Sequence, residues 1–98
     1  MRWSVGFVAE GDPATDAVVT MDEVVELADA VAPLNGIATG GNSTRYGAQI
    51  VVEAETREEA IARGRAQFDA AVVKAGLPGY PVVREEAISE FEDMMGEP

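Results

Sequence analysis

Residues 2–10 alternate between two kinds of side chain. One parity holds the larger apolar residues Trp3, Val5, Phe7 and Ala9. Alternation with a period of two is typical of a half-buried strand, so we expect these four side chains to point inward. The strand is expected to end at Gly11-Asp12-Pro13, because proline fixes φ and glycine relaxes the turn.

A helix is predicted to begin after Thr20. Thr20 and Glu23 have the spacing of a capping box. In this motif the Thr20 hydroxyl accepts a hydrogen bond from the Glu23 amide, and the Glu23 carboxylate accepts one from the Thr20 amide. Pro33 and Asn35-Gly36 are expected to end this helix. Its predicted apolar stripe consists of Met21, Val24, Val25, Ala28, Val31 and Ala32.

Two extended segments follow, residues 37–41 and residues 45–54. The second alternates clearly, and Gly40, Gly41 and Asn42 between them tolerate unusual backbone angles. This arrangement predicts a β-hairpin.

A second helix is expected to begin at a second capping box, Thr56 to Glu59, and to end at Gly76. Leu77 is expected to contact Val72, as in a Schellman motif. A last strand should run from Tyr80 to Glu85 and continue to about Ile88. The predicted apolar stripe of the second helix consists of Ile61, Gly64, Phe68, Ala71, Val72 and Ala75.

The order strand, helix, strand, strand, helix, strand predicts an α+β protein with a ferredoxin-like βαββαβ arrangement. We expect a four-stranded antiparallel sheet in the order 4-1-3-2, with two helices on one face. The prediction treats residues 1–98 as one such domain, with an acidic tail over about residues 89–98. Many unrelated functions use this fold, so function has to be argued from a site.

Composition restricts the chemistry. The chain has no histidine and no cysteine, which excludes a Cys/His zinc site, a cysteine nucleophile and a Ser-His-Asp triad. A general base would have to be Asp, Glu, Tyr or Lys74, the only lysine. There is no Walker or dinucleotide-binding motif. We therefore expect no cofactor and no metal, and we favour a protein that is not an enzyme.

The net charge of −11 is unevenly distributed. Residues 85–98 contain six acidic residues and no basic one. Such a charge repels phosphate backbones and anionic lipids, so direct nucleic-acid or membrane binding is not expected. No apolar run approaches the roughly 20 residues of a membrane span, and the start lacks a signal-peptide pattern. A cytoplasmic location is the expectation.

Two loops are candidates for ligand binding. Amides of the turn at Gly40, Gly41 and Asn42 could form an anion-binding nest beside Arg45. The alternative is an ordinary hairpin turn, which also requires glycine and asparagine for its backbone angles. The connection 11–19 is long and carries Asp12 and Asp16, which could line a pocket or bind a hard cation. The simpler interpretation of these two acids is a solvated surface loop.

Two other surfaces are candidates for protein binding. Phe91, Met94 and Met95 lie among acidic residues and could anchor a partner, or pack on the protein's own core. The sheet face that the helices leave open is expected to present Ser4, Gly6, Val8, Gln49 and Val51.

These observations favour a small, acidic, non-catalytic interaction module. It would form a homodimer or bind another protein through the open sheet face, an edge strand or the acidic tail. The alternatives are a small-molecule sensor or enzyme that uses the 11–19 loop and Arg45, or an acidic mimic of nucleic acid.

Overall fold

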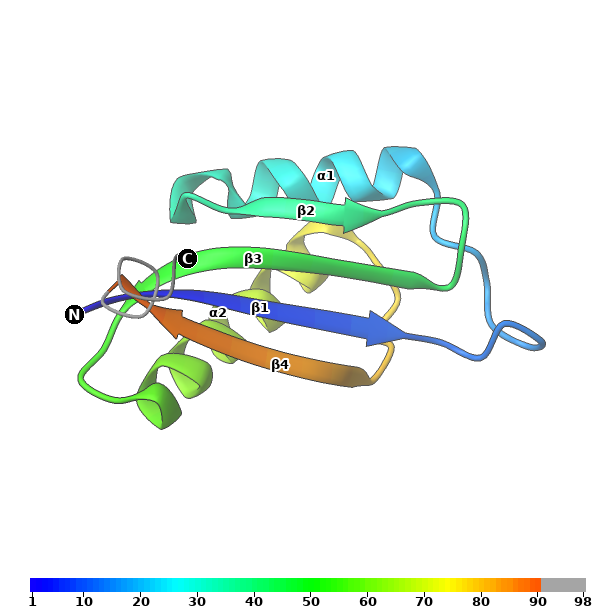
Figure 1. Ribbon diagram of the computed structural model, residues 1–98. Coiled ribbons are helices and arrows are strands. Elements are labelled where there is room, and N and C mark those ends of the chain that lie inside the picture. Colours follow the sequence, from blue (N-terminus) through cyan, green and yellow to red (C-terminus); the bar gives the residue numbers. More distant parts are fainter. Residues whose placement is uncertain (91–98) are drawn as a thin grey trace, which may run out of the picture.

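The computed structural model describes residues 1–90 and shows an α+β fold with a four-stranded antiparallel sheet and two helices (Figure 1). The expected docking residues Phe91, Met94 and Met95 lie outside the described residues. A short 3₁₀ helix, η1, follows the first helix. In chain order the elements are β1 (Arg2–Glu10), α1 (Met21–Val31), η1 (Ala32–Leu34), β2 (Ile37–Gly40), β3 (Arg45–Glu53), α2 (Arg57–Ala75) and β4 (Val82–Ser89).

The sheet has the strand order β2-β3-β1-β4, which is the predicted order 4-1-3-2 counted from the opposite edge. β1 pairs with β3 along its whole length, from Arg2 opposite Glu53 to Glu10 opposite Arg45. β4 lies on the other side of β1, with an irregularity in the register at Val8. Figure 1 shows both helices on one side of the sheet, so the opposite side has no covering layer.

The core lies between β1, β3 and the helices. All four residues predicted to point inward from the first strand are buried. The rings of Phe7 and Phe68 stack with centroids 5.2 Å apart, and Tyr46 lies 6.2 Å from Phe68. Gly64 permits this packing, because a Cβ there would lie 3.1 Å from Val5 Cγ1 and 3.2 Å from the Phe7 ring.

The predicted helix termini are largely confirmed. Thr20 and Glu23 form both hydrogen bonds of the capping box. Thr56 accepts from the Glu59 amide at 3.2 Å, but the Glu59 carboxylate pairs with Arg63 at 3.1 Å, so the structure shows only one half of the second box. Gly76 has the left-handed φ of 77°.

The predicted apolar stripe of α1 was partly wrong. Met21 and Val25 are 52% and 53% exposed, whereas Leu27, which the stripe omitted, is fully buried. α1 buries Val24, Leu27 and Val31, because the position of the sheet selects a helix face rotated from the one expected. Met21 instead lies against Gly41, whose added Cβ would meet the Met21 sulfur.

The last strand begins later than predicted, at Val82. Tyr80 leaves the strand direction to meet Tyr46, with ring centroids 6.3 Å apart, and its hydroxyl donates to the Ala17 carbonyl at 2.5 Å. Pairing between β1 and the chain that leads into β4 begins with the hydrogen bond that the Glu10 amide donates to the Pro81 carbonyl at 3.0 Å. Among residues 1–90 there is no helix with the length and hydrophobicity to span a membrane.

Replacing Thr56 with Ala should destabilise the protein by about 1 kcal/mol, because the Glu59 amide loses its capping acceptor. Urea denaturation followed by circular dichroism measures this difference. Thr56→Ser is the matched control, since it keeps the hydroxyl and should stay close to wild type. Equal stability of the Ala and Ser variants would show that Thr56 does not act as the cap.

Leu27→Ala should destabilise the protein by about 2–5 kcal/mol, because it removes a fully buried side chain. Val25→Ala, two residues away on the exposed side of α1, should change stability by less than about 0.5 kcal/mol. Urea denaturation of the two variants compares them directly. Similar losses for both would contradict the helix orientation described above.

Stability should decrease at alkaline pH because of Tyr46. Burial raises the pKa of Tyr46, and its hydroxyl donates to the Pro78 carbonyl at 2.6 Å. The contribution to stability is therefore complete below the ordinary tyrosine pKa of about 10, and is lost as the pH rises above it. Phenylalanine cannot ionise, so the Tm of Tyr46→Phe should fall less than that of wild type between about pH 9 and about pH 11. Parallel Tm curves would refute this assignment.

Candidate functional site

The side of the sheet opposite the helices, called the open face below, is the main candidate surface. It is formed by the side chains of β1 and β3 that alternate with the buried ones, and by their neighbours on the edge strands. Gly6 and Ser4 keep its centre low, because neither projects a large side chain. Its residues are Arg2, Ser4, Gly6, Val8, Glu10, Ile37, Thr39, Arg45, Gly47, Gln49, Val51, Glu53, Arg84, Glu86 and Ile88.

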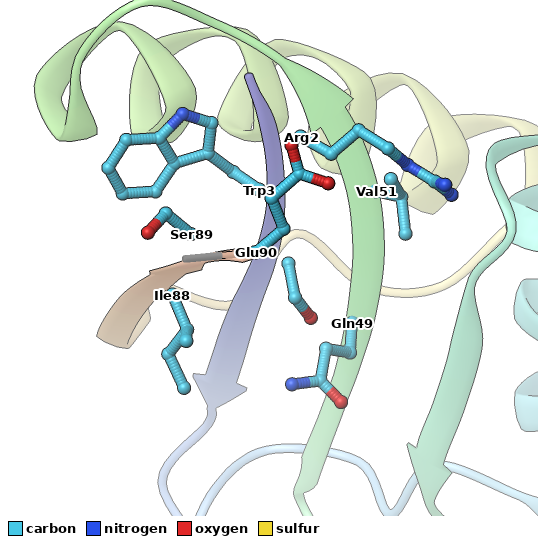
Figure 2. A pocket seen from close by; sticks show the side chains of 8 residues that line it. Arg2, Trp3, Gln49, Val51, Ile88, Ser89 and Glu90 are labelled. Atoms are coloured by element: carbon cyan, nitrogen blue, oxygen red, sulfur yellow. The ribbon is translucent and has the colours of Figure 1, made fainter. Parts of the chain in front are cut away.

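A hollow of about 290 Å³ lies at the start of β1. Figure 2 shows the Arg2 side chain reaching across β3 beside Val51, with Ile88 on the β4 side and Gln49 at the foot of the hollow. Arginine, hydroxyl and amide groups therefore lie next to aliphatic walls.

A second hollow of about 310 Å³ lies farther along the same face. Gly6 and Val8 form its floor, with Ile37 on β2 and Arg84 on β4 at its sides. Gln49 lines both hollows and so forms the ridge between them. A Cβ added at Gly6 would meet only Gln49 Cγ, at 3.9 Å, so the surface above Gly6 has room for another side chain.

The open face carries unpaired positive charge in a strongly acidic protein. Arg84 pairs with Glu86 at 3.2 Å. By contrast, Arg2 and Arg45 form no ion pair with any residue in the described range 1–90, although Glu53 and Glu10 are their cross-strand neighbours. Both guanidinium groups are therefore available to an anionic partner.

The arginines on the helix side are engaged differently. Arg65 contacts both Asp69 and Glu85 at 3.1 Å, and these partners raise its pKa, with the Asp69 hydrogen bond as the largest cause. Glu85 and Glu86 belong to the acidic segment 85–98. At least two negative charges of this segment are therefore paired with arginines of the same chain.

The turn predicted to form an anion nest has the positive φ angles expected of it, but one of its amides is already hydrogen-bonded within the protein. Gly40, Gly41 and Asn42 have φ values of 122°, 118° and 59°. The Asn42 amide donates to the Val19 carbonyl at 2.8 Å and thereby joins the hairpin turn to the connection after β1. Arg45 stands on the open face opposite Glu10.

The connection 11–19 is ordered by its own acidic residues. Asp16 Oδ2 accepts from the Asp12 amide at 2.7 Å, and Asp12 Oδ1 accepts from the Ala14 amide at 2.9 Å. The Gly11 amide also donates to the Thr44 carbonyl at 2.8 Å. None of the six predicted ligand-binding residues lines either hollow. In the described range no three His, Cys, Asp or Glu side chains gather as a metal site would require.

Sequence reasoning placed the centre of the open face correctly but missed its borders. Arg2 shares the outward parity of Ser4, Gly6 and Val8, but the site residues predicted from the sequence do not include it. Ile37, Arg84 and Ile88 could not be assigned without the register of the edge strands. The alternation along β1 is the one local signal that pointed to Arg2.

Comparison of the chain with known protein families, curated proteins and solved structures finds no significant match.

Proposed function

We propose that this protein is a non-catalytic interaction module that binds a protein surface through the open face of its sheet. The observation that carries the proposal is the pair of adjoining hollows across all four strands, separated by Gln49. We also propose that the fold is ferredoxin-like, which the βαββαβ order and the strand order β2-β3-β1-β4 support.

The shape of the surface favours a protein over a small molecule. Small-molecule sites usually enclose most of the ligand in a cleft. Both hollows here are open depressions on one sheet face, and their combined width suits a broad contact.

The chemistry of the surface supports the same choice. Val8, Val51 and Ile88 supply apolar area at the middle rows, and Arg2 and Arg45 stand at opposite ends of the strands. Protein interfaces commonly combine an apolar centre with a polar rim, and arginine is enriched in them.

The two alternative functions receive less support. A ligand site at the 11–19 connection would use Asp12 and Asp16, whose carboxylates already hold backbone amides. A nucleic-acid mimic would need a continuous anionic surface, and ion pairs with Arg65 and Arg84 interrupt the part of the acidic segment that the structure describes.

A lysine at Gly6 should block the open face without disturbing the core, because the space above this position is free. Immobilised wild-type chain, Gly6→Lys and Val73→Lys would be compared for proteins captured from cells of the source organism. Val73 is 79% exposed on α2 and provides a charge-matched control away from the open face.

The proposal predicts proteins captured by wild type and by Val73→Lys but lost with Gly6→Lys. Circular dichroism should show that all three chains are equally folded. Capture that is the same for all three, or that depends on Val73 instead, would argue against the open face as the binding surface.

A further inference from the structure

We infer that the open face binds a second copy of this chain, related by a two-fold axis that runs parallel to the strands between β1 and β3. This inference rests on the proposed function, that the open face binds a protein. The pairing of β1 with β3 determines the orientation of the second copy.

The axis converts neighbours within one sheet into facing residues across the interface. Rotation about it places β1 of one copy over β3 of the other at the same position along the strands. Each residue of β1 therefore faces the partner's copy of the residue that it pairs with in its own sheet. The register of β1 and β3 consequently decides whether the face is complementary to itself.

The sizes of the paired residues are complementary. Gly6 pairs with Gln49, and Ser4 pairs with Val51. In the dimer, the Gln49 ridge of each copy faces the free space above Gly6 of the other, where an added Cβ would meet only its own Gln49. An axis perpendicular to the strands and passing through this row would instead place Gln49 against Gln49 and Gly6 against Gly6, with a steric clash beside an empty space.

The charges at both ends are also complementary. Glu10 pairs with Arg45 and Arg2 pairs with Glu53 in the sheet. Across the two-fold axis each arginine faces an acidic residue of the other copy. Arg2 and Arg45, which have no ion pair among residues 1–90, would then both have a carboxylate partner.

The size of the face predicts a weak, reversible dimer. β1, β3, β4 and β2 contain 9, 9, 8 and 4 residues. At about 3.4 Å per residue and about 4.8 Å between strands, they present roughly 500 Å² per copy. The total of about 1,000 Å² lies at the lower end of specific interfaces. Facing sheets cross at about 30°, so the central rows superimpose best, and the long arginine side chains accommodate the offset at the ends.

Charge reversal in two separate chains tests the dimer and its axis together. Sedimentation equilibrium would measure the dissociation constants of wild type, Glu10→Arg and Arg45→Glu. Wild type should show a concentration-dependent dimer, and each variant alone should dimerise at least about tenfold more weakly, because like charges then face each other. An equimolar mixture should regain wild-type affinity, since the two arginines that one variant carries at these positions then face the two glutamates of the other.

Control variants separate this effect from net charge. Glu26→Arg and Lys74→Glu make the same charge changes on exposed helix positions and should leave dimerisation unchanged. Because the chain has no cysteine, a short bis-maleimide reagent gives a second measurement. It should join a Ser4→Cys chain to a Val51→Cys chain, which face each other across this axis. It should not join a Ser4→Cys chain to a Val8→Cys chain, because Val8 lies four residues, about 13 Å, farther along the strand.

Each other outcome overturns the inference in an identifiable way. A monomer at millimolar concentration, together with partner capture that Gly6→Lys abolishes, would refute the second copy and leave the proposed function standing. Capture that is insensitive to Gly6→Lys would refute the proposed function itself. The axis would be refuted if wild type forms a dimer but the equimolar mixture of the two charge variants does not, and if Ser4→Cys chains are cross-linked to Val8→Cys chains.

Discussion

The close approach of α2 to β1 at Gly64 is the contact on which the rest of the structure depends. A side chain at this position would press against Val5 and the Phe7 ring, both of which are buried. The absence of a Cβ lets Phe68, one turn later, stack on Phe7 and approach Tyr46. This contact commits one side of β1 to the core and thereby leaves the other side facing outward.

The open face follows from that commitment, because both helices lie on the same side of the sheet (Figure 1). Its character comes from the register of the two central strands. Small residues stand beside larger ones at the middle rows, and opposite charges stand side by side at both ends. A surface with such alternation along a central strand pair can be complementary to a rotated copy of itself, which is a requirement of isologous interfaces.

Several motifs that resemble binding sites in the sequence serve the fold instead. The carboxylates of Asp12 and Asp16 hold backbone amides of their own loop, and the Asn42 amide joins the hairpin turn to Val19. Tyr80 closes the same end of the molecule through the Ala17 carbonyl. These hydrogen bonds satisfy backbone groups that a long connection would otherwise leave to solvent.

Local patterns in the sequence were sufficient for the strand faces, the cap at Thr20, the turn at Gly40 and Gly41, and the helix end at Gly76, because each depends on residues within a few positions. The predicted strand order also agrees with the structure. Only the tertiary structure decided that Leu27 rather than Val25 is buried and that Tyr80 leaves the last strand. It also brought Arg2, Gln49 and Ile88 to one hollow. The physical reason is that these features depend on contacts between segments tens of residues apart, and a local sequence pattern does not determine how such segments are placed.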